Sequence, residues 1–442
     1  MKHRPVQGDN AGLQYEAMVR KPAALVATVI LYAAALVSSL GAGAQLPDTF
    51  FDEESAPAVA YVVQQPHDPI AQLNDSLANG SAALSYDAGG SGYLRSVLNA
   101  LGIPVESQLA VFSKTSVQAP IISPSNPRTL FFNDNVVIGW PRGGFIEAAA
   151  VDPQLGVIFY YLDQHASASP RFERTHSCTS CHLSLEATLS IPGMLLRSEA
   201  TTAGGRTMQQ LGREIVDHRL PFGKRWGGYY VTGRNVGIAS LANVMLAETM
   251  DTESPVPPQT IALTTLKDKF STDGYLSQYS DIAALMVFDH QMRMTNLLAR
   301  MSWEARASAG QPDAKTLIDS VAREFVDYLL FVDEAPLTKR VEGSSGFTEW
   351  FSTQGPADSR GRSLRQLDLR QRLLRYPCSY IIYTEAFDAL PDAAHDAIYR
   401  RIWAVLSGQD QGPRYARLTP PDRQAIIEIL RDTKKRLPEY FR

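Results

Sequence analysis

The chain has 442 residues, of which 45% are hydrophobic and 20% are charged, and its formal net charge is −4. These values are ordinary for a globular protein long enough for two or three domains, and the charge gives no case for nucleic-acid binding. The sequence has no fixed-period repeat, no P-loop and no GxSxG motif. The most familiar nucleotide-binding and hydrolase signatures are therefore excluded.

The N-terminus resembles a secretory signal. Residues 23–37 form an apolar run that two basic residues precede, and "GAGA" follows it, ending at Ala44. Charged, apolar and small residues in this order predict a signal peptide over residues 1–44, with Met18 as the better start. The alternative is an uncleaved anchor in the inner membrane. Both interpretations place the rest of the protein outside the cytoplasm, in the periplasm.

The next part of the chain predicts a lead-in, two helices and a small sheet. Residues 45–66 resemble a flexible lead-in, Asp68 and Pro69 predict the capped start of a short helix, and a second helix is expected over 91–103. Short β-rich runs then follow, divided by turn residues. They cover 107–113, 129–133, 135–140, 145–151 and 156–163, with a hairpin signal at 152–156.

Two of the three cysteines lie in the stretch "SCTSCHLSLEATLSIPGMLLRS", where Cys178, Cys181 and His182 form a C-x-x-C-H motif. A redox disulfide of the thioredoxin type follows a strand in a βαβ unit, but a polar, loop-like stretch precedes the motif. Structural zinc would usually want a second cysteine pair, which the chain lacks. A further alternative is that Cys178 and Cys181 are small buried residues whose spacing is accidental. The interpretation we favour is attachment of a c-type haem, for which this motif is the signature.

The spacing has a physical reason. Two thiols three positions apart on the first turn of a helix, Cys178 and Cys181, can reach the two vinyl groups of one porphyrin edge and become thioethers. His182 then points its imidazole at the iron. The residues after it predict that the helix continues until Pro192. We therefore expect one covalent haem c, with His182 as a metal ligand.

The second axial ligand is less determined. Met194 follows a Pro-Gly turn and is far enough along the chain to return to the opposite face of a haem, so we expect it as the second metal ligand. It could instead be a core residue. His290, on the apolar stripe of a predicted helix, and His218 are competing ligands, and an open position is a further alternative.

Beyond the motif the chain becomes mainly helical. Residues 67–250 are expected to form the haem-binding region with the small sheet, residues 251–260 are a proline-rich linker, and residues 261–437 form a helical region. The predicted fold class is α+β, mainly α, with a small antiparallel sheet leading into the haem-binding segment. Cys378 is expected to be buried. The main helices are predicted over 280–306, 312–332, 380–390, 393–408 and from Thr419.

The motif matches c-type cytochromes in general, which implies thioethers at Cys178 and Cys181 and an axial ligand at His182. The chain also resembles a little-characterised bacterial family of exported cytochrome-c-domain proteins. That resemblance implies haem binding and electron transfer, and no known substrate. Further segments, over roughly residues 92–437, carry the resemblance: "SKTSVQAPIISPSNPRTLFFND", "AAVDPQLGVIFYYLDQ", "RWGGYYVTG", "SDIAALMVFDHQ" and "YPCSYIIYTEAFDALP".

Three functions follow as hypotheses. The first is an exported mono-haem electron carrier with a redox partner protein. Its length is unexpected, because a minimal carrier needs only one domain of roughly 100 residues. The second is a haem enzyme, peroxidase-like or oxidase-like, with an open or displaceable sixth ligand, so enzyme activity stays uncertain. The third is a haem-based sensor or scaffold. No nucleic-acid partner is expected, and membrane contact is expected only if the N-terminal segment is uncleaved.

Overall fold

The computed structural model describes residues 59–248 and 255–441. The predicted signal peptide over 1–44, the start at Met18 and most of the lead-in over 45–66 lie outside the described residues. Among the described helices, none combines the length and hydrophobicity that crossing a bilayer requires.

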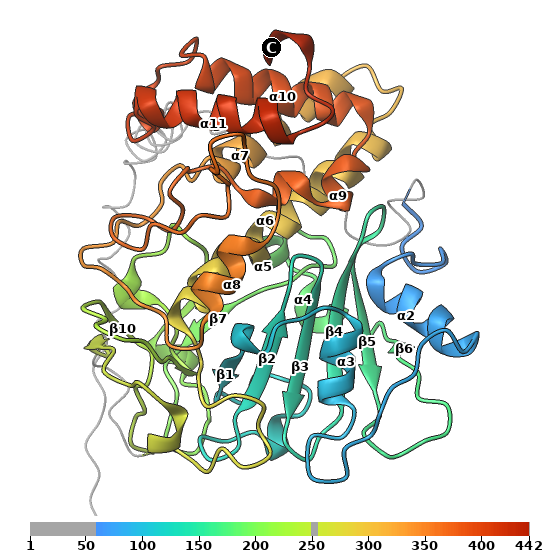
Figure 1. The fold of residues 1–442 in the computed structure, drawn as a ribbon, viewed down its shortest axis with the longest axis vertical. Helices are drawn as coiled ribbons and strands as arrows, with labels where there is room; N and C mark the ends of the chain where they lie inside the picture. Colours follow the sequence, from blue (N-terminus) through green and yellow to red (C-terminus); the bar gives the residue numbers. More distant parts are fainter. Residues whose placement is uncertain (1–58, 249–254, 442) are drawn as a thin grey trace, which may run out of the picture. The chain divides into compact units, whose positions relative to one another are not determined.

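A seven-stranded antiparallel sheet organises the first half of the described chain (Figure 1). Its centre is a meander of neighbouring strands, as the alternation of β-rich runs and turns predicts. The strand order is β6-β5-β4-β3-β2-β1-β9. The strands are β1 (Leu109–Val111), β2 (Arg128–Phe132), β3 (Val136–Pro141), β4 (Ile146–Asp152), β5 (Gly156–Leu162), β6 (Glu173–Arg174) and β9 (Tyr229–Tyr230).

The hairpin between β4 and β5 has the predicted position. Asp152 pairs with Gly156 and Ile146 with Leu162. Gly156 has a φ of +83°, a conformation that glycine adopts without steric cost. The Asp152 carboxylate accepts the N–H groups of Gln154 and Leu155 at 2.7 Å each, which closes the turn.

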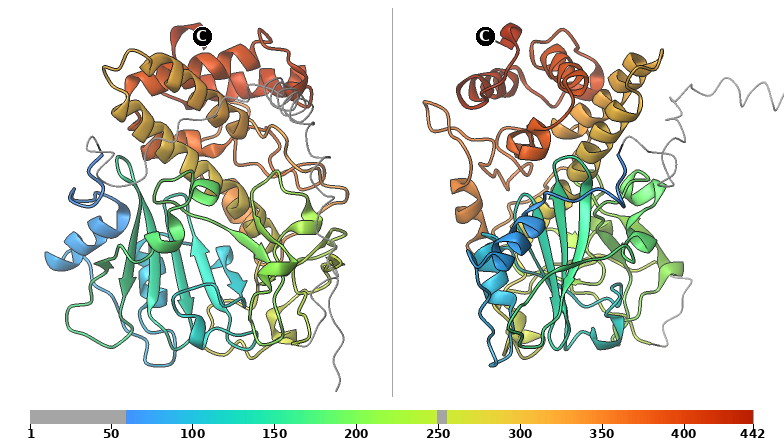
Figure 2. Two further views of the ribbon diagram at one scale, coloured as in Figure 1. Left: turned by 180° about the vertical axis from the view of Figure 1, so that it is seen from behind. Right: turned by 90° about the vertical axis from the view of Figure 1, so that its right-hand side faces the viewer.

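The two faces of the sheet pack against different parts of the chain because successive side chains point to opposite sides. Ile138, Ala148 and Ile158 share a core with helices α2 (Pro69–Ala78) and α3 (Leu94–Ala100). The opposite face packs against the segment that contains the C-x-x-C-H motif and against α6 (Ile282–Ala307). Figures 1 and 2 show α2 and α3 on one side of the sheet and the motif segment on the other.

The predicted caps of two helices are confirmed. The Asp68 carboxylate accepts the N–H groups of Ile70 and Ala71 at the start of α2. Thr419 and Asp422 form a reciprocal capping box at the start of α11 (Pro420–Thr433).

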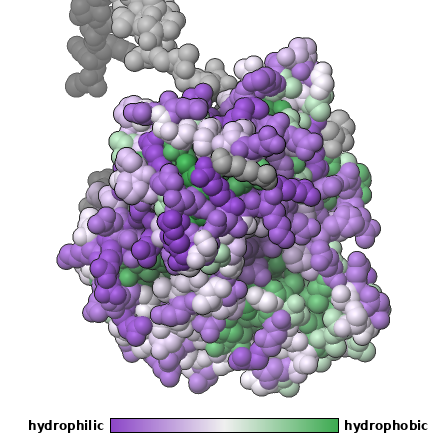
Figure 3. Space-filling view, turned by 45° about the horizontal axis from the view of Figure 1, so that its top comes forward, coloured by the Kyte–Doolittle hydropathy of each residue, from purple (hydrophilic) through white to green (hydrophobic). Residues whose placement is uncertain are grey.

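The second half is helical, as predicted. Helix α6 packs against α7 (Ala314–Leu329), which packs in turn against α10 (Asp392–Leu406). Helix α6 is buried on nearly every side rather than along one stripe, because the sheet, the motif segment and α7 all cover it. A short helix that we did not predict, α8 (Phe347–Thr353), begins after Gly346. The upper part of the surface in Figure 3 is mostly hydrophilic, with a smaller hydrophobic area.

The prediction of an antiparallel sheet followed by helices is confirmed. The described residues belong to one compact unit, and one continuous core includes Leu109 of the sheet and Ile426 of the last helix. Part of the expected linker over 251–260 pairs with the rest of the chain, because β11 (Gln259–Thr260) lies antiparallel to β10 (Ala239–Ser240).

Candidate cofactor site

The C-x-x-C-H motif lies on a short helix, α4 (Thr179–His182), directly after the last strand of the meander and its edge partner β6. The prediction that this helix continues to Pro192 is wrong. Leu183 is extended, with φ −133° and ψ 97°, and the Ser184 hydroxyl accepts the Ala187 N–H to start a new helix, α5 (Leu185–Thr188). A serine that caps a new helix ends the preceding one, because its own backbone must be extended.

The four residues predicted for the site line one cavity. Cys178, Cys181, His182 and Met194 face the sheet across about 1130 Å³ of empty space, part of it open to solvent. The apolar part of the wall includes Leu130, Val137, Gly139, Ala149, Phe159, Tyr229, Phe288 and Met292.

The His182 imidazole is oriented by the backbone. Its Nδ1 lies 2.9 Å from the Gly193 carbonyl oxygen, and the Gly193 N–H donates to the His182 carbonyl at 2.9 Å. Burial lowers the pKa of His182, so the ring is neutral near pH 7 and Nδ1 carries the proton. Within the described chain, Nε2 makes no hydrogen bond. It is therefore the free lone pair that a metal would bind, with the arrangement that supports metal-bound histidines.

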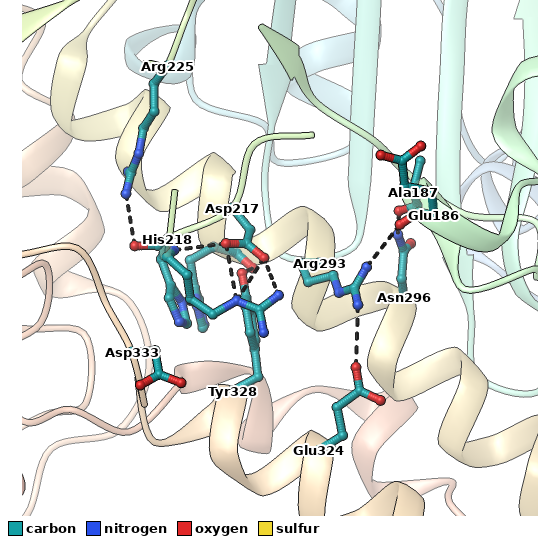
Figure 4. Close-up of polar contacts among 12 residues, drawn as sticks. Glu186, Ala187, Asp217, His218, Arg225, Arg293, Asn296, Glu324, Tyr328 and Asp333 are labelled. Atoms are coloured by element: carbon teal, nitrogen blue, oxygen red, sulfur yellow. Dashed lines mark hydrogen bonds and ion pairs between the residues drawn. The ribbon is translucent and has the colours of Figure 1, made fainter. Parts of the chain in front are cut away.

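Helix α6 holds the loop after the motif in place. The Asn296 side chain accepts the Met194 N–H at 2.9 Å and donates to the Met194 carbonyl at 2.7 Å. Figure 4 shows Asn296 and Arg293 directed at the α5 segment, and Arg293 also contacts Glu324 of α7. A Cβ at Gly193 would lie 2.6 Å from Asn296 Oδ1, so only glycine allows this approach. Met194 is buried against the cavity as a result.

An acidic and a basic group form the polar wall on the sheet side. Arg128 lies 2.7 Å from the Glu147 carboxylate, which also accepts hydrogen bonds from Ser116 and Gln118. Burial alone would raise the pKa of Glu147, but Arg128 and these hydrogen bonds outweigh it, so the pKa lies below its usual value. The pair is therefore charged, and Arg128 Nε is buried without a hydrogen-bond partner.

Arg197 is the unpaired charge of the cavity. It begins strand β7 (Arg197–Glu199), makes no ion pair among the described residues, and its Nε is buried without a hydrogen-bond partner. Burial lowers its pKa, and the neighbouring Arg213 adds to the effect. A guanidinium in this state is a suitable donor to a carboxylate on a bound molecule. No sequence pattern points to Arg197.

His218 and His290, the competing ligands, do not line this cavity. Their Nδ1 atoms lie 2.8 Å apart, and His290 Nε2 lies 2.7 Å from the Ser379 hydroxyl. Both rings are buried and stack on Tyr328 and Phe331. Figure 4 shows His218 beside Tyr328, away from the α5 segment. The pair is a buried polar contact between α6 and the loop before β9.

This pair predicts a loss of stability in acid. Burial lowers the pKa of His290 to about 3 and that of His218 well below its ordinary value. The stability these rings contribute is therefore present above about pH 6.5 and falls as the pH drops toward 3, by about 2 kcal/mol for one ring between pH 6.5 and 5. Denaturant unfolding at pH 7.5 and 5 should show a smaller loss in His290→Gln than in the unchanged chain.

His165→Gln is the matched control, since His165 is exposed and its variant should keep the full acid sensitivity. Equal losses in the unchanged chain and in His290→Gln would contradict the prediction.

Among the described residues, no group of three or more histidine, cysteine, aspartate or glutamate side chains is arranged to hold a metal ion. Comparison with protein-family models, with curated proteins and with solved structures found no match.

Proposed function

We propose that this protein is an exported mono-haem c-type cytochrome that transfers electrons outside the cytoplasm. One observation carries the proposal: Cys178, Cys181, His182 and Met194 line a single cavity. The two thiols would hold the haem as thioethers and His182 Nε2 would bind its iron. The sequence contains one C-x-x-C-H motif, so we propose that the protein binds one haem.

The residues present fit this group. The cavity has an apolar wall against which a porphyrin face could pack. Arg197 Nε has no hydrogen-bond partner in the described chain, so Arg197 could pair with a propionate. The Gly193 carbonyl keeps His182 in the tautomer that leaves Nε2 free. When bound, the haem supplies an iron that gains and loses one electron. The residues of the chain would hold it and orient its histidine.

Two methionines compete for the second axial position. Met194, the predicted ligand, follows Gly193, whose backbone is hydrogen-bonded to His182, so its own backbone begins on the histidine side of the cavity. Met292 reaches the same cavity from α6 and is buried. We retain Met194 as the proposed ligand because it lines the cavity, and its side chain would have to reach the opposite face from there.

Absorption spectra test this choice. The protein should be exported in a host that matures c-type cytochromes and its spectra recorded in both oxidation states. We expect a far-red band typical of methionine ligation, no response of the reduced form to carbon monoxide, and loss of the band in Met194→Ala. Met292→Ala is the matched control and should keep it. Loss of the band in Met292→Ala alone would make Met292 the ligand.

A haem enzyme is the second candidate function, and one observation favours it. A second cavity adjoins the first, and Cys178 lines both. A high-spin spectrum or rapid binding of carbon monoxide would mean an open iron and would favour this alternative. If the protein carries no covalent haem, both candidate functions are excluded. A disulfide between Cys178 and Cys181 then becomes the preferred interpretation.

The location is part of the proposal. If residues 1–44 are a cleaved signal, the haem protein is periplasmic and exchanges electrons with a soluble or membrane-bound redox partner. If the segment is uncleaved, the same protein is anchored to the inner membrane. Mass spectrometry of the purified protein distinguishes the two, because cleavage leaves an N-terminus at residue 45.

A further inference from the structure

The second cavity lies along the same face of the sheet, beyond the haem-attachment motif. It contains about 1690 Å³ of empty space, part of it open to solvent. Val117, Glu147, Tyr160, Ser177 and Cys178 line both cavities, so the two are separated by no more than single side chains. A molecule in the second cavity would therefore meet the edge of whatever is bound at Cys178.

Aromatic rings form part of its wall. Phe145 and Tyr161 meet edge to face, with ring centroids 5.9 Å apart, and Tyr86 contributes a partly exposed ring. Such rings present flat apolar surfaces on which another aromatic ring packs favourably. The wall therefore suits a planar molecule better than a flexible chain.

One hydrogen-bond donor in the wall has no partner. Gln164 uses its Oε1 to accept the Tyr93 N–H at 2.8 Å, which turns its amide nitrogen away from Tyr93. That nitrogen, Nε2, is buried and makes no hydrogen bond. A buried amide without a partner costs free energy, and an oxygen atom of a ligand would satisfy it.

The charge of the wall restricts the ligand further. Asp87, Glu147 and Asp163 line the cavity, and no lysine or arginine is among its described lining residues. Arg128 already neutralises Glu147, and the Asp163 carboxylate contacts Nδ1 of His165, which also lines the cavity. Asp87 and Asp163 remain as the acidic groups. An anionic ligand would be repelled, while a hydroxyl or ammonium group would find acceptors.

We infer that this second cavity binds a phenol that carries no negative charge, beside the Cys178 attachment point. The ring packs on Phe145 and Tyr161, and an oxygen atom of the ligand accepts the hydrogen bond from Gln164 Nε2. The site is formed by protein side chains and does not require haem. The inference rests on the proposed function only in naming haem as the group that the ligand would meet at Cys178.

Calorimetric titration of the full-length exported protein tests the charge preference with three probes that share one phenol ring. They are 4-hydroxybenzyl alcohol, which is neutral, tyramine, which is cationic, and 4-hydroxybenzoate, which is anionic. We expect the first two to bind and the third to bind at least about ten-fold more weakly, because its carboxylate faces the two aspartates.

Gln164→Glu tests the donor. Its carboxylate can still accept the Tyr93 N–H, but it has no amide hydrogens for the ligand, so affinity for 4-hydroxybenzyl alcohol should fall about five- to ten-fold. Gln154→Glu makes the same change on the exposed β4–β5 turn, outside the cavity, and should bind normally. Matching unfolding midpoints for the two variants would show that both are folded.

The outcomes separate the two proposals. If haem is attached and no probe binds, or if Gln164→Glu binds as well as Gln154→Glu, the inference is overturned and the proposed function stands. Preferential binding of 4-hydroxybenzoate would overturn it as well. If the probes bind as expected to a protein that carries no covalent haem, the phenol site is supported and the proposed function fails.

Discussion

Replacing Cys178 and Cys181 together with alanine is expected to abolish covalent haem completely. The unchanged chain, exported in a host that matures c-type cytochromes, should keep its haem on a denaturing gel and after extraction with acidified organic solvent. The double variant should lose it in both assays. The reason is chemical: thioethers survive unfolding, whereas an axial bond from His182 to iron does not outlast the fold that orients it.

Cys378→Ala is the matched control, because it removes the third cysteine of the chain. Cys378 is fully buried and does not line the cavity, so this variant should keep its covalent haem. Haem that remains attached to the double variant would contradict the prediction. If the unchanged chain carries no haem and its mass is two hydrogens lower before reduction than after it, Cys178 and Cys181 form a disulfide.

Replacing Arg225 with methionine is expected to destabilise the protein by about 3–5 kcal/mol. Arg225 and Asp289 are both buried, with a guanidinium nitrogen 3.1 Å from the carboxylate, and Trp226 Nε1 donates to the same carboxylate at 3.0 Å. Burial raises the pKa of Asp289 to about 7, even though Arg225 and Trp226 act against it. Without the cation, a buried carboxylate is left that must stay charged at a cost or take up a proton.

Denaturant unfolding at pH 8, where the carboxylate of the unchanged chain is ionised, measures the effect. Arg219→Met is the control, because Arg219 also pairs with an aspartate, Asp217, but is more than a third exposed. The loss at that partly solvated pair should be about 1 kcal/mol or less. Adding Asp289→Asn to Arg225→Met should recover part of the stability, since no buried charge then remains. Equal losses for the two arginines would contradict this account.

The features that the sequence predicted well depend on neighbouring residues. The β-rich runs, the 152–156 hairpin and the caps at Asp68 and Thr419 all arise from interactions within a few positions, and each is confirmed. The C-x-x-C-H motif is also local, so Cys178, Cys181 and His182 could be selected by spacing alone. The break at Leu183 also has a local signal, because Ser184 is a typical helix-capping residue.

The features that the sequence did not predict come from distant segments. Strand β9 joins the sheet beside β1, although roughly 120 residues separate them in the chain. Met292 and Arg197 reach the cavity from a buried helix and from a two-stranded sheet, and neither has a sequence pattern that points to it. His290 is a candidate iron ligand by its place on an apolar stripe, but it contacts His218 instead. Periodicity identifies a buried face, but it cannot tell which neighbour covers that face.

These distant pairings have a consequence for the order in which the molecule forms. The sheet is complete only when β9 has reached β1, and the Met194 loop is fixed only when Asn296, 102 residues later, has packed against it. Contacts between such separated segments require large loops to close, which slows folding. The cavity that Cys178 and Cys181 line is therefore completed late, after these distant segments have packed. If haem is attached to these thiols as proposed, a maturation enzyme would have this interval in which to act, before the cavity closes.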